Sequence, residues 1–151
     1  MPSLTVRAAT SADLPQVFVL VRRMFDDLGA TEASTQWETD ARERLASDHD
    51  VATFVATDAD DRPVAAAVGV IDQRLPSPRR PNGRIGYVEW LATDPGHRRQ
   101  GAARLALSAL LGWFDDRDVP TVDVHSSEAA LPLYEQLGFG TPPAVPMRRL
   151  T

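Results

Sequence analysis

The stretch that decides the fold runs Thr93-Asp94-Pro95-Gly96-His97-Arg98-Arg99-Gln100-Gly101-Ala102-Ala103-Arg104-Leu105. In it, a basic turn joins an apolar strand to an apolar helix. The first backbone N–H groups of a helix lack intrahelical acceptors and lie at the positive end of its dipole, so they bind anions. Gly101 and Ala103 keep this surface small, because a side chain beyond Cβ would separate the backbone from the anion. With Arg98, Arg99 and Arg104 around it, the turn is predicted to bind a pyrophosphate.

Two common phosphate-binding loops are excluded by the residues around Gly101. Gly96 and Gly101 have the spacing of a P-loop, but Ala102 and Ala103 stand where that loop needs Lys and Ser or Thr. The dinucleotide fingerprint needs a third glycine, which does not follow. The pattern that remains, Arg98-x-x-Gly101-x-Ala103, resembles the Gln/Arg-x-x-Gly-x-Gly/Ala signature of the GNAT superfamily of acyl-CoA-dependent N-acyltransferases.

A second motif follows in the order and at the separation of that superfamily. Residues 122–127 read as a strand, and Leu131-Pro132-Leu133-Tyr134-Glu135-Gln136-Leu137-Gly138-Phe139 resembles the closing element Leu-Tyr-x-x-Leu-Gly-Phe. The resemblance is close over residues 84–140 and covers the N-terminal part in outline. It implies a mixed α/β (α+β) fold, in which a central mixed, mostly antiparallel sheet is flanked by helices.

Composition agrees with one soluble domain over residues 1–151, since 43% of the residues are apolar and 25% charged. The absence of cysteine excludes disulfides, a thiolate nucleophile and cysteine-based zinc sites, so acyl transfer is direct or uses oxygen. A net charge of −5 disfavours nucleic acid and favours cationic substrates. Without a long apolar run or a signal segment, we expect a cytoplasmic protein with no membrane partner.

Hydrophobic periodicity predicts the order β-α-α-β-β-β-α-β-α-β. Capping-box patterns at Thr10-x-x-Asp13 and Thr35-x-x-Glu38 begin the first two helices, and Gly29 ends the first. An acidic turn joins two strands as a hairpin, and a proline-rich loop follows. The later ranges are 51–57 and 63–72 for the hairpin strands, 75–83 for the loop, 85–93 for the next strand, 101–115 for a buried helix and Thr141 to Leu150 for a short last strand.

The resemblance implies that acetyl-CoA is the cofactor. The backbone of the strand end would hydrogen-bond the pantetheine arm as a neighbouring strand does, and the basic turn would hold the pyrophosphate. Ser127 stands where many relatives carry an asparagine that orients cofactor and substrate, and its hydroxyl is shorter. The predicted cofactor-binding residues are Leu91, Ala92, Thr93, Arg98, Arg99, Gln100, Gly101, Ala102, Ala103, Arg104 and Ser127. The histidines are scattered, so no metal site is expected.

Three residues are candidates for catalysis, each with a structural alternative. Tyr134 matches the tyrosine of the closing element, which implies a general acid for the departing thiolate; the alternative is a packed core tyrosine. Glu89 in an apolar strand is either a base acting through water or half of a salt bridge to Arg84 or a loop arginine. His125 suits a base by its ordinary pKa, but a lone histidine is also often structural.

These features predict an N-acetyltransferase that moves an acetyl group from acetyl-CoA to a primary amine by direct transfer in a ternary complex. The alternative is a non-catalytic acyl-CoA-binding sensor or partner-binding module. The acceptor is a small-molecule or peptide amine whose identity the sequence leaves open. Acyl-chain preference and the choice between monomer and homodimer are open as well.

Overall fold

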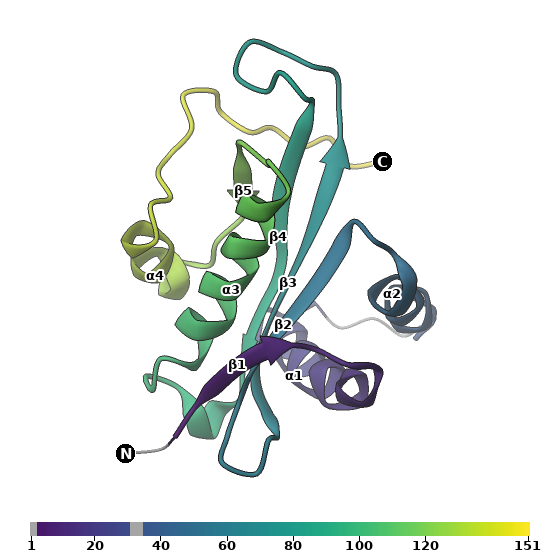
Figure 1. Cartoon of the computed structure of the whole chain (residues 1–151), viewed down its shortest axis with the longest axis vertical. Coiled ribbons are helices and arrows are strands. Elements are labelled where there is room, and N and C mark those ends of the chain that lie inside the picture. The colour runs from purple at the N-terminus through teal and green to yellow at the C-terminus, as the bar shows by residue number, and fades with distance from the viewer. Residues whose placement is uncertain (1–2, 31–34) are drawn as a thin grey trace.

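The structure is a computed structural model that describes residues 3–30 and 35–151. Its centre is a five-stranded sheet in the order β1-β2-β3-β4-β5, with helices on both faces (Figure 1). The strands are β1 (Thr5–Ala8), β2 (Val51–Thr57), β3 (Pro63–Gln73), β4 (Arg84–Thr93) and β5 (Val122–Val124), and the helices are α1 (Leu14–Asp27), α2 (Gln36–Ser47), α3 (Ala102–Asp116) and α4 (Leu131–Gln136).

The sheet is mixed and mostly antiparallel, which confirms the predicted fold class. Strands β1 to β4 pair antiparallel in sequence order, whereas β5 pairs parallel to β4. The buried residues form two clusters: one holds the inner side of α3 together with Tyr134 of α4, the other the inner side of α1. No helix of the described residues is long and apolar enough to cross a membrane.

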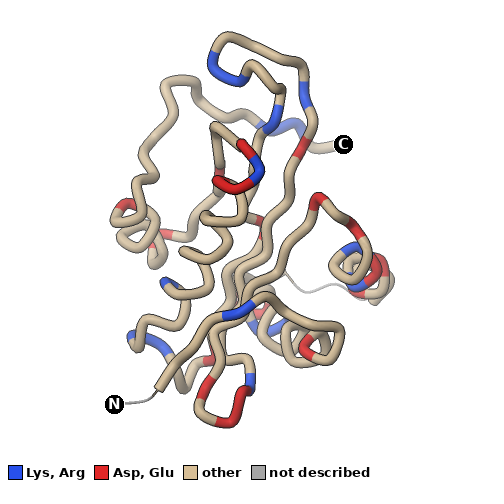
Figure 2. Tube along the Cα trace, viewed as in Figure 1, with Lys and Arg blue, Asp and Glu red and all other residues tan. Residues whose placement is uncertain are grey.

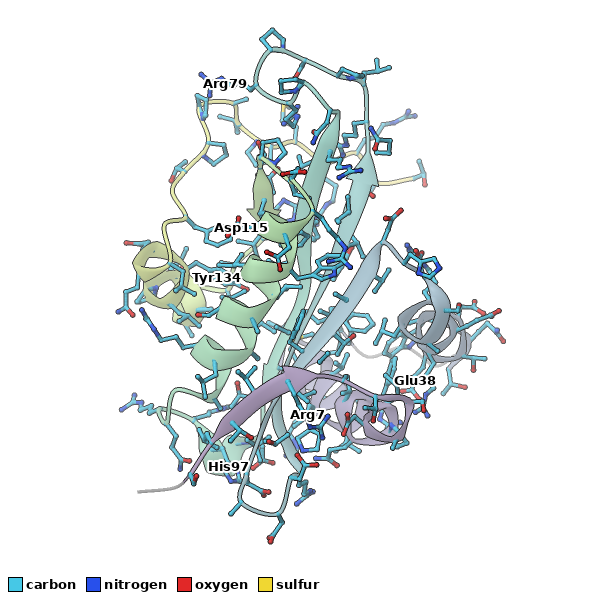
Figure 3. All side chains as sticks on the ribbon, viewed as in Figure 1. Arg7, Glu38, Arg79, His97, Asp115 and Tyr134 are labelled. Carbon is cyan, nitrogen blue, oxygen red and sulfur yellow. The ribbon has the colours of Figure 1, made fainter. Side chains whose placement is uncertain are left out.

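The start of α1 is fixed by a capping box and a buried carboxylate. Asp13 accepts from the backbone N–H of Thr10 at 2.7 Å, as the sequence pattern predicts. The same carboxylate accepts from both terminal nitrogens of Arg7, at 2.6 and 3.0 Å, so β1 is tied to the helix start (Figure 3). The Arg7 guanidinium lowers the pKa of Asp13 to about 2. This bond fixes how α1 leaves the sheet.

Helix α3 packs closely against the sheet because two glycines leave room for Phe114. A Cβ on Gly86 of β4 would lie 2.7 Å from the Phe114 ring, and a Cβ on Gly69 of β3 would lie 2.8 Å from it. Phe114 itself is fully buried. The two glycines therefore set the distance between α3 and the two central strands.

The predicted last strand, Thr141 to Leu150, is wrong. This segment has no regular structure and runs as an irregular trace from α4 over the end of the sheet (Figure 1). Pro142, Pro143 and Pro146 have no N–H to donate to a ladder, and Val145 and Met147 are 82% and 94% exposed. The strand predicted at 122–127 is also shorter, since β5 ends at Val124.

Gly86→Ala is expected to lower the free energy of unfolding by about 1–3 kcal/mol, because its Cβ overlaps the Phe114 ring. The double variant Gly86→Ala/Phe114→Leu is expected to lose less than the sum of the single changes, since the smaller side chain makes space. Urea denaturation measures both. Gly112→Ala in α3, where a Cβ meets nothing within 4 Å, is the control and is expected to stabilise. A Gly86→Ala protein as stable as wild type would contradict this packing.

Candidate active site

Strand β4 loses one of its two neighbours halfway along. Pairing with β5 covers Gly86 to Val88 and ends at Val88↔Val124, while pairing with β3 continues to Thr93. On the β5 side, the backbone of residues 89–93 has no strand partner among the described residues. A free backbone edge can hydrogen-bond an extended ligand arm as a further strand would. The edge contains Leu91, Ala92 and Thr93, the stretch predicted to hold pantetheine.

The free edge begins at a bulge that contains Glu89. In the β3–β4 register, Val68 lies opposite Trp90 and Gly69 lies opposite Val88, so Glu89 has no partner in β3. A bulge turns one residue out of the regular alternation and often lies beside an active site. Glu89 thus stands at the point where β4 and β5 separate.

The far end of the free edge runs directly into the basic turn. Arg99 has φ +62° and Gly101 has φ +83°, so two residues of the turn are left-handed before α3 begins at Ala102. The first ladder bond of α3 runs from the Leu105 N–H to the Gly101 carbonyl at 3.0 Å. The N–H groups of the preceding residues, from Ala102 to Arg104, therefore have no acceptor inside the helix. Successive free N–H groups at a left-handed turn form a concave anion site.

Asp94 braces this turn, a role that the sequence analysis missed. Its carboxylate accepts from the Gly96 N–H at 3.1 Å, from His97 Nδ1 at 2.8 Å and from Arg23 of α1 at 3.1 Å. The hydrogen bond from His97 lowers the pKa of Asp94 most, burial opposes it, and the hydrogen bond from Gly96 lowers the pKa further. The Asp-Pro pair at the end of a strand was the available signal, since Asp caps such turns.

The arginines of the turn differ in their contacts. Arg98 is exposed and pairs with Asp27 at the end of α1, at 3.2 Å, and Arg104 donates to the Gln136 side chain of α4 at 2.8 Å. Arg99 and Gln100 are exposed. Figure 2 shows this basic group at the end of the molecule that holds the start of α3. The predicted pyrophosphate residues are thus gathered in one place.

Tyr134 lies on α4 and packs into the cluster beneath α3 (Figure 3). It is 5% exposed, and its ring meets Phe139 edge-on with centroids 5.2 Å apart. Burial raises the pKa of Tyr134 to about 12, and the neighbouring Tyr87 adds to this. The phenol is therefore protonated near neutral pH. Its packing agrees with the structural alternative, and its protonation agrees with a donor role.

Glu89 makes no ion pair within the described residues. Arg84, its expected partner, instead donates to the Arg117 carbonyl. Partial burial raises the pKa of Glu89, the charge of Asp72 raises it further, and Arg44 opposes both. A raised pKa makes the ionised carboxylate a stronger base than an ordinary glutamate. The salt-bridge alternative to Arg84 is therefore wrong.

His125 lies just past the end of β5, outside the strand in which the sequence analysis placed it. Its Nδ1 is 2.9 Å from the hydroxyl of Tyr87 in β4, and the two rings meet edge-on. Tyr87 is the second residue that the sequence analysis missed, because the contact depends on the parallel register that sets Tyr87 opposite Asp123. Ser127 is exposed and begins the turn before α4. Within residues 3–30 and 35–151, no hydrogen bond joins Tyr134 to Glu89 or His125.

The family model described as Acetyltransferase (GNAT) family matches residues 16–139. The chain belongs to this family. The match contains both motifs, the free edge of β4 and the turn before α3, so the predicted resemblance is confirmed.

The chain is also similar to curated proteins and, in fold, to solved structures. N-acetyltransferase Eis from Mycobacterium tuberculosis and from Mycobacterium bovis is 28% identical over 99% of this chain, which spans about 35% of the length of those relatives. Among solved structures, a predicted acetyltransferase with acetyl-CoA from Clostridium acetobutylicum has a TM-score of 0.85 and 19% identity, with 97% of this chain and 96% of the other covered. An aminoglycoside acetyltransferase from an uncultured soil metagenomic sample, in complex with sisomicin, has a TM-score of 0.74 and 17% identity, with 98% and 95% covered.

The geometry of this site fits an acyl-CoA. A Cβ on Gly101 would meet nothing within 4 Å, so open space lies at the start of α3. The free N–H groups suit an anion, and the unpaired edge of β4 suits an extended amide-containing arm. The turn and the edge are continuous in the chain. One continuous surface therefore offers binding groups for both the pyrophosphate and the pantetheine arm of the donor.

Gly101→Val is expected to weaken acetyl-CoA binding by at least about tenfold, because its side chain occupies the space before the free N–H groups. The φ of +83° also costs about 1–2 kcal/mol for any L-residue. Gly101→Ala is the matched control, since it carries the same backbone strain without atoms beyond Cβ. Calorimetric titration measures affinity, and urea denaturation measures stability. A folded valine variant that binds as tightly as the alanine variant would place the phosphates elsewhere.

Proposed function

We propose that this protein is an acetyltransferase that moves the acetyl group of acetyl-CoA to a primary amine of a small molecule or peptide by direct attack in a ternary complex. The observation that carries the proposal is the unpaired edge of β4, which begins at the Glu89 bulge and ends in the anion-binding turn. Such an edge can fix the donor's direction, with its acyl end toward Glu89. Bound acetyl-CoA supplies the thioester carbonyl that the amine attacks. Direct transfer also agrees with a chain that contains no cysteine.

In this proposal Glu89 accepts a proton from the acceptor amine, through water. Amines are cationic near neutral pH and attack only when neutral, so a base is required. The raised pKa of Glu89 favours that role, and no cation within the described residues neutralises its charge at close range. Asp72 adds negative charge nearby, which attracts a cationic acceptor before deprotonation.

Tyr134 holds a proton at its Oη for the thiolate that leaves. Burial keeps the phenol protonated, with a pKa of about 12, so the hydroxyl can donate as negative charge develops on sulfur. Within residues 3–30 and 35–151, this hydroxyl donates to no protein acceptor and is left for the ligand. Its location in the cluster beneath α3 gives the ring a fixed position.

The acceptor class is inferred from charge and from the relatives. The chain carries a net charge of −5, which favours cationic amines. One structural relative is an aminoglycoside acetyltransferase in complex with sisomicin. Polyamines and amino sugars are therefore the first acceptors to test, followed by peptide amines.

The proposal predicts release of free coenzyme A when the protein meets acetyl-CoA and its acceptor. A panel of polyamines, amino sugars, amino acids and peptides is assayed with a thiol reagent. The chain has no cysteine to react with the reagent and no lysine to be acetylated, so the background is low. Acetyl-CoA alone is expected to raise the melting temperature, because it binds only the folded state. Binding without turnover on any amine would favour the sensor alternative instead.

Tyr134→Phe is expected to lower kcat by about 10²- to 10⁴-fold, because it removes the proton donor and keeps the ring. Acetyl-CoA affinity and the free energy of unfolding serve as controls and are expected to change little, since the Phe139 contact involves the ring. The measurement needs a proven acceptor and a chemical step that limits the rate. Unchanged kcat under those conditions would leave Tyr134 as a packing residue.

A further inference from the structure

A second strand loses its neighbour at the opposite edge of the sheet. Pairing of β1 with β2 ends at Ala8↔Phe54, and one further bond runs from the Ala9 N–H to the Thr53 carbonyl at 2.9 Å. From there to its first residue, Val51, β2 stays paired with β3 on its other side. Among the described residues, this part of β2 has no strand neighbour on the β1 side. A short length of sheet edge is therefore left open between α2 and the end of α3.

A hollow of about 380 Å³ lies at this open edge. The end of α3 contributes Trp113 and Arg117, the end of α2 contributes Leu45 and Ala46, and the rest comes from β2, the end of β1 and the start of α1. The anion-binding turn lies at the other end of α3 (Figure 1). Because α3 has 15 residues, these two places are about 22 Å apart along the helix. The hollow is thus separate from the candidate active site.

Arg117 is the one charged residue among those that line the hollow. Its guanidinium lies over the Trp113 ring, 4.6 Å from the centroid, and it forms no ion pair within residues 3–30 and 35–151. The neighbouring acids Asp115 and Asp118 line a different hollow, beside Asn82. Stacking on the indole fixes the plane of the guanidinium and leaves its N–H groups for another partner. A planar fork of N–H donors matches a carboxylate.

The other acids close in sequence to the lining residues leave that charge available. Asp13 and Asp48 already have arginine partners, at 2.6 and 2.8 Å. Asp50 and Asp116 are exposed, where water and salt screen them. The hollow therefore offers a cation to a ligand in a chain whose net charge is −5.

The rest of the lining is mostly apolar. Leu14, Leu45 and Val51 are aliphatic, and Phe54 adds a second aromatic ring to that of Trp113. Thr53 also lines the hollow, and its buried Oγ1 has no hydrogen-bond partner in the described part of the chain. A buried hydroxyl without a partner is unfavourable unless a water or a ligand completes its bond. Apolar walls with a few polar groups are typical of small-molecule sites.

We propose that this hollow is a second ligand site, which binds a small carboxylate with an aromatic or bulky apolar body. Arg117 pairs with the carboxylate, and the ring and aliphatic side chains of the walls contact the body. The site is independent of acetyl transfer, since none of its residues belongs to the β4 edge or to the basic turn.

The first test compares two probes of the same shape, indole-3-acetate and its uncharged amide, by calorimetric titration. We expect the acid to bind and the amide to bind at least about tenfold more weakly, because only the acid forms the ion pair. Saturating acetyl-CoA is expected to leave the affinity for the acid unchanged. Equal affinities for acid and amide, no binding of the acid at about 10 mM, or competition by acetyl-CoA would each overturn the proposal.

The second test locates the probe by ¹H–¹⁵N NMR of the indole N–H groups. The chain has three tryptophans, and only Trp113 lines the hollow. A Trp113→Phe variant assigns its signal. We expect indole-3-acetate to shift the Trp113 signal and to leave those of Trp37 and Trp90 in place. A shift confined to the other two tryptophans would place the probe elsewhere and contradict the site.

The third test changes the hollow itself. Arg117→Gln is expected to weaken binding of indole-3-acetate by at least about tenfold, because the charge is lost. Arg79→Gln, in the exposed proline-rich loop, is the matched control and is expected to bind as the wild type does. Ala46→Trp fills the hollow from an exposed position on α2 and is expected to abolish binding, with urea denaturation as the check of folding. Undiminished binding by a folded Arg117→Gln or Ala46→Trp protein would reject the proposal.

Discussion

The candidate site depends on the loss of one strand neighbour. Where β5 stops pairing at Val124, β4 continues for five residues with hydrogen-bonding groups facing an open side. The β3 side of β4 stays fully paired, so the free edge is held rigid by the rest of the sheet. Glu89 is turned outward by a bulge at the start of this edge, and the phosphate-type turn follows at its end. The end of pairing between β5 and β4 thus sets where the free edge begins, how long it is and in which direction it runs.

Close packing behind the sheet keeps that edge in place. The glycines opposite Phe114 let α3 lie close to β3 and β4, and α3 begins at the anion-binding turn. Because the helix cannot slide without moving a fully buried ring, its N-terminus keeps a fixed relation to the strand edge. Packing of small residues against a large one here fixes the distance between two parts of a ligand surface.

Most of the correct predictions rest on local sequence patterns. The contacts that were missed depend on the long-range register of the strands. The turn from Thr93 to Leu105, the helix starts and the hairpin are set by neighbouring residues, and the structure has them at the predicted ranges within a few positions. The strand predicted at 141–150 is wrong because its prolines lack the N–H groups that pairing in a sheet needs. The contact of Tyr87 with His125 could not be read from the sequence, since it depends on which residue of β5 lies opposite Tyr87. The role of Glu89 was left open for the same reason, because its expected partner Arg84 turns toward Arg117.

The ion pair between Arg98 and Asp27 links the turn to the end of α1. Both side chains are 58% exposed, so the pair contributes at most about 1 kcal/mol to stability. An anion that binds Arg98 competes with Asp27 at little cost and leaves a free carboxylate at the end of α1. An anion at the turn would thus leave the charge of Asp27 unpaired at the end of α1, on the other face of the sheet. Ionic strength weakens both the pair and its competitor, so the occupancy of the turn is set by the salt of the surrounding solution as well as by the ligand.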